Sequence, residues 1–296
     1  GIFIESHGAV SVSKVKAHAN RLNNIEISNW DVPDTMPKTV TVNFIDTDGY
    51  DGSSYVSSRG LAIATKGNVT INNIIAVEHF YDGVNINTCQ YDGGKCLGSG
   101  SVTIKSTGSP NIFSYNGYTG ISVFARGSIS IYNILAIENG YSGSYKGVYL
   151  TNDYSNGSGT ITIDANLPQP FVNEISGNTS YGLHVKSKGA ILLGRSLMKN
   201  NGNSYGAYLI SSASTDLPVT VRFSEFKNNN GYGLLVASRG LITLTNVISE
   251  NNTGSSYGAY LDNTGGKGGV TVNTSGTFTN SFSGNYYEGL IIRSNG

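Results

Sequence analysis

Residues 120–127 read GISVFARG, and the same pattern of glycine, alternating apolar residues and a closing glycine recurs along the chain. The other copies are GIFIESHG at 1–8, GLAIATKG at 60–67, GLHVKSKG at 182–189, GLLVASRG at 233–240 and GLIIRSNG at 289–296. A second motif lies between them: GVNINT at 83–88, GVYLTN at 147–152, GAYLIS at 206–211 and GAYLDN at 258–263. Self-similarity at such a period is typical of a repeat architecture whose unit, here one coil, has about 23 to 37 residues.

Apolar residues alternate with polar ones inside each coil. Short coils carry two alternating pairs on either side of a turn glycine, for example Ile129/Ile131 after Ile121/Val123, and Ile191/Leu193 after Leu183/Val185. Alternation with β-branched residues predicts short strands that bury one face. Such strands bury that face by stacking coil on coil, with like positions ~4.8 Å apart. We therefore expect an all-β solenoid with almost no helix.

Glycine and asparagine mark the expected turns. A glycine such as Gly67, Gly127 or Gly189 separates two strands, where a left-handed backbone is least costly for glycine. An asparagine follows the second or third strand in many coils, and stacked amides can bond one another along such a column. The expected members are Asn20, Asn116, Asn139, Asn178, Asn200, Asn229, Asn251 and Asn285, and His79 interrupts them.

These motifs resemble the right-handed parallel β-helix family, which includes polysaccharide lyases, phage tailspikes and very large bacterial secreted surface proteins. Within it, the chain looks most like the repeat regions of those large surface proteins. The resemblance implies a single right-handed parallel β-helix of about ten to eleven coils, with short and long coils alternating. Residues 1–296 would form one β-solenoid domain, a segment of a longer chain or assembly.

Charge and hydropathy narrow the functional classes. The chain has 19 basic and 19 acidic residues, and 13% of its residues are charged. A protein held to nucleic acid by net charge needs a basic excess, so no nucleic-acid partner is expected. No run of apolar residues approaches the length that spans a membrane.

Cys89 and Cys96 flank six residues in one long excursion. Two thiols with poor neighbouring ligands do not make a metal site. A disulfide would stabilise the protein by about 2.5 kcal/mol on the loop-entropy model, with free thiols as the alternative. Because disulfides persist in oxidising compartments, the pair predicts an extracellular or cell-surface protein.

The segment 46–52 reads DTDGYDG, and its carboxylates are hard oxygen ligands of the kind that calcium prefers. Asp46, Asp48 and Asp51 are therefore the candidate metal ligands. The motif lacks the distal bidentate carboxylate, and the alternative is an Asp/Gly surface turn. No other cofactor is expected.

Two surface columns recur. A cation precedes the turn glycine at Lys66, Arg126, Lys188 and Arg239, and could meet an anionic glycan or simply keep a turn soluble. The chain has 19 tyrosines, with Tyr181, Tyr205, Tyr232, Tyr257 and Tyr287 recurring just before the strand-opening glycine. Tyr149, Tyr208 and Tyr260 point outward from equivalent strands, where tyrosines could line a sugar-binding or protein-contact face.

Catalysis by a β-helix enzyme needs carboxylates and a base in one groove. Asp153 and Asp262 lie several coils apart, and His184, outward by parity, is expected to be a solvated strand residue. The main expectation is therefore a non-catalytic structural or adhesive repeat protein, part of a fibre, sheath or surface stalk. The alternative is a polysaccharide-degrading β-helix enzyme (lyase or glycoside hydrolase) or a glycan-binding module.

The expected partner is the chain itself, end to end or side by side. Neither end carries a helix, a proline-rich plug or a charged cap in the sequence. Uncapped coils expose backbone groups and apolar residues that can template β-pairing. A surface glycan is the second expected partner.

Overall fold

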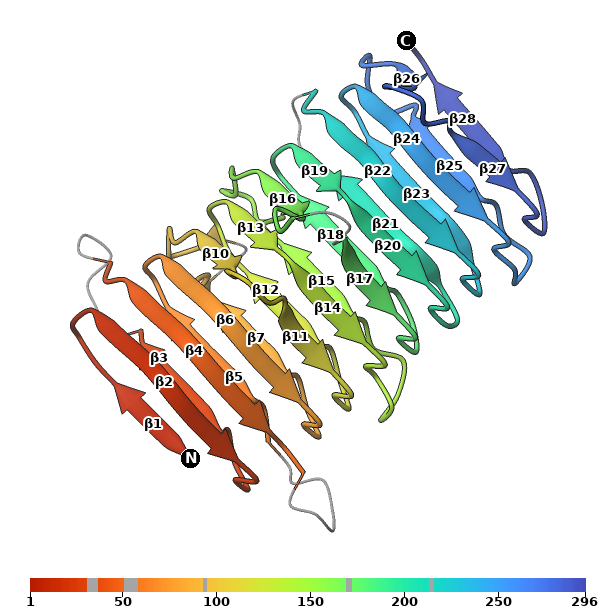
Figure 1. Cartoon of the computed structure of the whole chain (residues 1–296). Helices are drawn as coiled ribbons and strands as arrows, with labels where there is room; N and C mark the ends of the chain where they lie inside the picture. Colours follow the sequence, from red (N-terminus) through yellow and green to blue (C-terminus); the bar gives the residue numbers. More distant parts are fainter. Residues whose placement is uncertain (31–36, 51–57, 93–94, 169–171, 213–215) are drawn as a thin grey trace.

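The computed structural model describes residues 1–30, 37–50, 58–92, 95–168, 172–212 and 216–296. Two long parallel sheets run from the first coil to the last, and the coils stack in one row between the two termini (Figure 1). The described residues form no helix, and accordingly no helix among them is long and apolar enough to cross a membrane. The all-β parallel solenoid expected from the alternating residues is confirmed.

Sheet A has eleven strands, and each pairs with the next one along the chain. They are β1 (Ile2–Glu5), β3 (Ile25–Asn29), β5 (Leu61–Thr65), β7 (Val84–Asn87), β12 (Ile121–Phe124), β15 (Val148–Thr151), β18 (Leu183–Ser187), β21 (Tyr205–Ser211), β23 (Tyr232–Ser238), β25 (Ala259–Asn263) and β28 (Leu290–Ser294). Each is the strand of one recurring glycine motif or of its counterpart in the first coils. The motifs are therefore in register, one above another.

Sheet B forms the opposite wall and has fifteen strands. They are β2 (Val10–His18), β4 (Val40–Asp48), β6 (Val69–Val77), β10 (Val102–Lys105), β11 (Asn111–Ser114), β13 (Ile129–Tyr132), β14 (Ile134–Ile137), β16 (Ile161–Asp164), β17 (Asn173–Ser176), β19 (Ile191–Gly194), β20 (Ser196–Lys199), β22 (Val219–Lys227), β24 (Ile242–Glu250), β26 (Val270–Asn273) and β27 (Ser281–Ser283). Some coils have one nine-residue strand in sheet B where other coils have two short strands. For example, the long strand β22 pairs with both β19 and β20 of the preceding coil.

A bend with left-handed backbone divides sheet B along its length. Its central residue has a φ between 39° and 57° in each coil that lacks an inserted loop, and these residues are Lys14, Phe44, Asn73, Asn133, Arg195, Phe223 and Asn246. Asparagine tolerates this conformation, whereas a bulky side chain adopts it at a cost. We call this line of residues the bend of sheet B.

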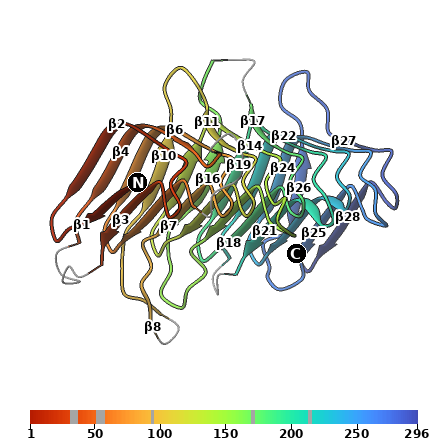
Figure 2. The same ribbon diagram turned by 90° about the horizontal axis from the view of Figure 1, so that it is seen from below.

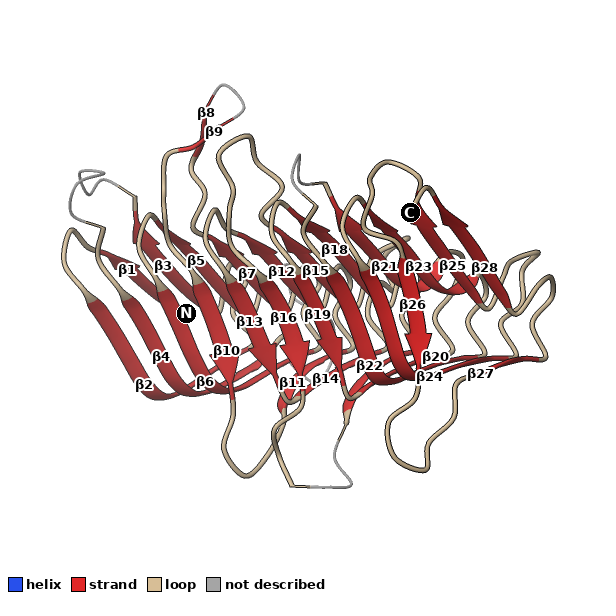
Figure 3. Cartoon of the chain, turned by 90° about the horizontal axis from the view of Figure 1, so that it is seen from above, coloured by secondary structure: helices blue, strands red, loops and turns tan. Residues whose placement is uncertain are grey.

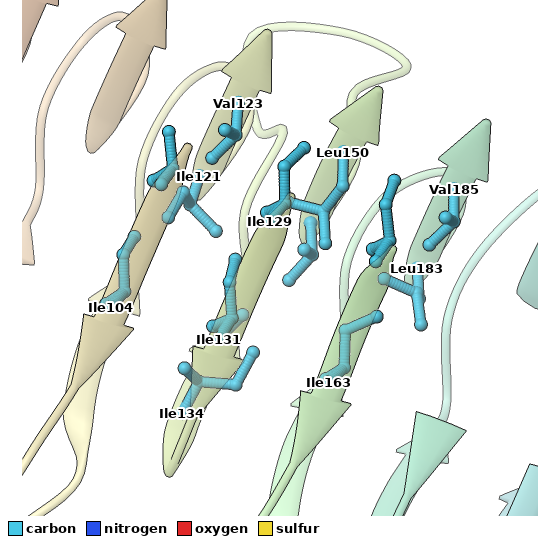
Figure 4. Close-up of a cluster of buried hydrophobic side chains, with 14 of the residues drawn as sticks. Ile104, Ile121, Val123, Ile129, Ile131, Ile134, Leu150, Ile163, Leu183 and Val185 are labelled. Carbon is cyan, nitrogen blue, oxygen red and sulfur yellow. The ribbon is translucent and has the colours of Figure 1, made fainter. Parts of the chain in front are cut away.

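The core is one continuous column of aliphatic side chains between the sheets. Figure 4 shows Ile121 and Val123, then Leu150, then Leu183 and Val185 following one another from strand to strand. All are fully buried, as are Ile129 and Ile131 opposite them. Burying one such side chain contributes roughly 1.5–3 kcal/mol, so repetition of the motif accounts for the stability of the stack.

The asparagine column differs from its sequence prediction by one residue in two coils. In six successive pairs, the Nδ2 of one asparagine donates to the Oδ1 of the next at 2.9–3.0 Å, and the members are Asn116, Asn139, Asn178, Asn201, Asn229, Asn252 and Asn285. Asn200 and Asn251, predicted as members, instead adopt φ of 55° at the preceding turn position. The side chain one residue later points inward.

Loops leave the stack at the corners. One excursion carries the two-stranded antiparallel hairpin β8 (Tyr91–Asp92) and β9 (Lys95–Cys96), which projects beyond the edge of sheet A (Figure 3). Viewed from below, further loops extend on the side of the stack away from this hairpin, for example between β10 and β11 and between β26 and β27 (Figure 2). These loops therefore belong to sheet B, whereas the hairpin lies at the edge of sheet A.

Candidate functional site

Aromatic rings line much of the outer face of the C-terminal half of sheet A, although Leu235 and Ile291 take the equivalent positions on β23 and β28. The register places Tyr149, His184 and Tyr208 side by side on β15, β18 and β21. The His184 ring lies 5.1 Å from each of the other two, measured between centroids. Parallel strands ~4.8 Å apart place equivalent rings at contact distance. The sequence indicated their outward direction, and the structure adds that they touch.

A second column of rings lies at the corner where each strand of sheet A begins. Tyr181, Tyr205, Tyr232 and Tyr257 each precede a strand-opening glycine, and successive rings are 5.0–5.3 Å apart. Tyr287, expected in the same place, is two residues before Gly289, yet its ring still lies 5.6 Å from that of Tyr257. We call the two columns the aromatic strip: Tyr149, Tyr181, His184, Tyr205, Tyr208, Tyr232, Tyr257 and Tyr260.

His184 is the most constrained residue of the aromatic strip. Its side chain faces outward, but it is only 8% exposed because Tyr149, Tyr181 and Tyr208 enclose it. The expectation of a solvated strand histidine is therefore wrong, since neighbouring coils supply the covering rings. Neither ring nitrogen has a hydrogen-bond partner. Desolvation, with repulsion from Lys146 and Lys186, lowers its pKa to about 3, so the ring is neutral at neutral pH.

Lys146 lies beside this histidine at the corner of β15. Its Nζ is 5.0 Å from the centre of the Tyr149 ring and 5.7 Å from that of Tyr181. Burial, followed by repulsion from Lys186, lowers the pKa of the Lys146 amine. Burial and the Asp153 carboxylate raise the pKa of the Tyr149 phenol. We call Lys146, Tyr149, His184 and Lys186 the basic cluster.

The basic cluster has the parts needed to hold an anion and move a proton. Two ammonium groups provide positive charge, and the nearest groups to Lys146 are rings, with the Asp82 carboxylate attracting it more weakly than burial and Lys186 act on it. Tyr149 keeps its proton and can donate it, whereas neutral His184 can accept one. Perturbed groups that gather on one face are candidates for acid–base chemistry. Sequence reasoning missed Lys146, although it precedes a strand-opening glycine as the strip tyrosines do.

Asp82 lies two coils toward the N-terminus in the corner column that contains Lys146. Its carboxylate accepts the backbone N–H of Thr119 at 3.1 Å and lies 3.5 Å from the Arg59 guanidinium. Desolvation nevertheless raises its pKa. Since these partners hold it, Asp82 anchors the corner rather than pairing with a second carboxylate in the manner of a glycosidase.

Two of the three predicted calcium ligands, Asp46 and Asp48, lie at the end of β4. Asp46 is 3.3 Å from Lys16 Nζ and 3.5 Å from His18 Nε2, and Asp48 accepts the backbone N–H of Tyr50 at 2.8 Å. Asp51 lies outside the described residues. Within the described ranges, no cluster of three or more histidine, cysteine or acidic residues could hold a metal. Calcium binding by the full segment stays a prediction.

The other predicted residues have clear positions. Cys89 and Cys96 form the expected disulfide at the base of the β8–β9 hairpin, with Cα atoms 4.7 Å apart. The turn cations are engaged rather than free: Lys188 contacts Asp153 at 3.2 Å, and Arg126 donates to the Asn156 carbonyl at 3.1 Å. These contacts favour their role in the turns over a charged stripe.

The sequence matches no protein-family model, and the search of curated proteins found no match. Two solved structures resemble the chain, both A-modules of Azotobacter vinelandii mannuronan C-5 epimerases. The AlgE4 module is 13% identical with a TM-score of 0.47, covering 100% of this chain and 82% of that one. The AlgE6 module is 14% identical with a TM-score of 0.39, covering 96% and 80%. The parallel pairing of the strands in the two long sheets is what confirms the parallel β-helix fold that the sequence motifs implied.

The main functional expectation needs correction. The solenoids found by the structural comparison are modules of epimerases, which are enzymes, and this finding stands against a non-catalytic structural or adhesive repeat protein. The alternative, a polysaccharide-degrading β-helix enzyme (lyase or glycoside hydrolase) or a glycan-binding module, agrees better with it, although an epimerase is neither a lyase nor a hydrolase. Identity this low extends to the fold alone, so the activity has to be argued from the side chains of this chain.

Proposed function

We propose that this protein binds a linear acidic polysaccharide along the outer face of sheet A and transfers protons at the sugar above the basic cluster. The observation that carries this proposal is His184, buried without a hydrogen-bond partner between tyrosine rings and two lysines. A buried polar group without a partner is costly in the free protein. A bound sugar would supply the missing partner once the tyrosine rings that now cover both nitrogens of His184 move apart.

The aromatic strip suits a polymer better than a small ligand. Ring contacts run without a break from Tyr149 on β15 to Tyr260 on β25. Half-buried tyrosines offer flat apolar surface with little loss of conformational entropy and a hydroxyl at the edge. A chain of pyranose rings presents a flat C–H face at regular intervals. Such a chain would lie along the solenoid axis.

The basic cluster favours an acidic sugar. A uronate carboxylate beside Lys146 and Lys186 would have its charge neutralised, which acidifies the C–H next to it. His184 could then take that proton, because the added negative charge raises its pKa, and Tyr149 could deliver one from its phenol. Return of a proton gives epimerisation, and departure of the adjoining sugar oxygen gives elimination. An extracellular location, where such polymers occur and disulfides persist, is part of the proposal.

Affinity electrophoresis in gels containing polygalacturonate or alginate tests the binding. Lys146→Ala should weaken retention by about tenfold, the effect of one lost charge-assisted hydrogen bond. Lys105→Ala, an exposed lysine on β10 of sheet B, is the matched control and should change nothing. Equal retention of wild type and Lys146→Ala would contradict the site.

Proton transfer is tested separately in D2O. Elimination would give the ultraviolet absorbance of unsaturated uronate, and epimerisation would place deuterium on the carbon that bears the carboxylate. Retention in the gel with neither signal would indicate a glycan-binding module without catalysis, which is the second candidate function. The length of the aromatic strip beyond His184 favours that second candidate.

A further inference from the structure

The bend of sheet B carries two pockets that are built alike. The first lies over coils near the N-terminus and the second over coils near the C-terminus, with volumes of about 440 Å³ and 540 Å³. Both lie on sheet B, not on the face that carries the aromatic strip. These volumes lie within the range of small-ligand sites.

The two pockets repeat similar side chains in the same order. Across three neighbouring strands, the left-handed bend residues are a cation, a phenylalanine and an asparagine. In the first pocket these are Lys14, Phe44 and Asn73, and in the second Arg195, Phe223 and Asn246. The registers of the flanking residues place the three opposite one another in both cases.

The likeness extends beyond the bend residues. Two positions after the phenylalanine stands an acid, Asp46 in one pocket and Glu225 in the other. Two positions after the asparagine stands an isoleucine, Ile75 or Ile248. Three residue types and two charges thus recur at matching positions, although the pockets are far apart along the chain. The general motif of the solenoid does not require this, because Asn133 alone occupies the bend between them.

Among the residues that the two pockets share, the phenylalanines give the strongest indication of a binding site. A non-glycine residue with positive φ is uncommon, and a bulky one there is a genuine outlier. Phe44 has a φ of 53° and is 56% exposed, and Phe223 has a φ of 49° and is 40% exposed. Asparagine would fill this turn at lower cost, as it does at Asn73. Strain of this kind concentrates at binding sites, and here it holds an aromatic face toward each pocket.

The charges of each pocket are already partly balanced. Asp46 contacts Lys16 at 3.3 Å, Glu225 contacts Lys227 at 2.6 Å, and Arg195 contacts Asp164 at 3.4 Å. A carboxylate has about four acceptor sites, so each acid retains acceptors. The aromatic surface is Phe44 in the first pocket, and in the second it is Phe223 with Phe278 edge-on to it at 6.2 Å between ring centroids. Opposite charges beside an aromatic surface favour an uncharged ligand with many hydroxyl groups over an ion.

We propose that these two pockets are equivalent sites for an uncharged pyranose unit, which stacks on Phe44 or Phe223. The neighbouring acid would accept hydrogen bonds from hydroxyl groups, and the asparagine amide and the cation would donate them. The proposal is independent of the acidic-polymer site on sheet A. It gives the solenoid two further contacts with a neutral glycan on a different face.

The test uses isothermal titration calorimetry and saturation-transfer NMR with maltotriose, cellotriose and chitotriose on the full chain. At least one trisaccharide should bind with a stoichiometry of two and receive saturation from phenylalanine protons. Phe44→Asn and Phe223→Asn should each reduce the stoichiometry to one, and the double variant should abolish binding. Both variants should fold, because asparagine occupies the same bend at Asn73 and Asn246.

Tyr115→Asn is the matched control, since Tyr115 is also an exposed aromatic residue with positive φ, 45% exposed at 58°, but lines neither pocket. It should leave the stoichiometry at two. Lys146→Ala should do the same, which separates this proposal from the one for sheet A. Unchanged trisaccharide binding in the double variant would overturn the assignment of these pockets. Benzoate, an aromatic anion, is the comparison ligand, and binding of benzoate but of none of the trisaccharides would overturn the assignment to a sugar.

Discussion

His79 takes the place that asparagine holds in the later coils. It is fully buried, and its backbone N–H donates to the Oδ1 of Asn116 at 3.1 Å, just as the N–H of Asn116 donates to Asn139. Its ring nitrogens lie 3.2 Å from Thr47 Oγ1 and 3.4 Å from Ser58 Oγ. The amide column is interrupted chemically here, as predicted, while the backbone geometry continues.

This burial should make stability depend on pH. Desolvation lowers the pKa of His79 to about 4 from its usual 6.5, so the neutral ring contributes stability above pH 6.5 that is lost as the pH falls toward 4. A difference of this size corresponds to about 3 kcal/mol. Urea unfolding of wild type and His79→Asn at pH 7 and pH 4 measures it. The variant should lose about 3 kcal/mol less on acidification, and equal losses would show that His79 does not titrate on unfolding.

His184 should show a conflict between stability and binding. His184→Phe replaces an unpartnered buried ring with an apolar ring of similar shape, so the free energy of unfolding should rise by about 1 kcal/mol. The same variant should weaken binding of acidic polysaccharide and lose any gain in affinity between pH 7 and pH 5. Urea midpoints and gel retention report the two effects. A variant that is less stable than wild type would argue that His184 serves packing alone.

At the scale of one element, side-chain amides of the asparagine column form the hydrogen bonds between successive coils at this corner. Asn201 donates to the Ile175 carbonyl at 3.0 Å and to Asn229 Oδ1 at 2.9 Å, and accepts from the Nδ2 of Asn178 at 2.9 Å. Every polar atom of its side chain is therefore satisfied inside the stack. One residue earlier, Asn200 is exposed and supplies the left-handed turn.

Adjacent asparagines should thus differ sharply in cost. Asn201→Ala leaves buried donors and acceptors unpaired and should destabilise the protein by about 3 kcal/mol. Asn200→Ala removes no buried bond and should cost only about 1 kcal/mol, the strain of alanine in a left-handed turn. Thermal or urea unfolding of the two variants compares them. Equal costs would mean that the turn, not the amide column, stabilises this corner.

At the scale of the whole molecule, the fold could be predicted because the alternation of apolar and polar residues within each coil identifies the side chains that point inward. The residues after each strand-opening glycine alternate, and stacking does the rest. The site could not be predicted in the same way, since Tyr149, His184 and Tyr208 meet only when three coils of different length come into register. A usable signal existed: each ring stands two positions after its strand-opening glycine. Parity gave the direction of His184 but not its enclosure.

The continuity of the core also determines how the molecule tolerates charge. Val185 is fully buried, and its strand neighbours Leu150 and Leu209 leave no route to water. Val185→Asp would place an unpaired carboxylate in that column and should cost about 4 kcal/mol or more. Lys186→Asp, one residue along on the outer face, is the matched control and should change stability by less than about 1 kcal/mol.

Because each coil contacts mainly its two neighbours, the damage from Val185→Asp should begin locally. Hydrogen exchange of the variant should accelerate most in β15, β18 and β21, and less in β3 and β5 at the far end of sheet A. Circular dichroism would follow the loss of strand on heating. Melting like wild type would refute the inward assignment of Val185, whereas uniform acceleration along all coils would show that the solenoid unfolds as a single unit.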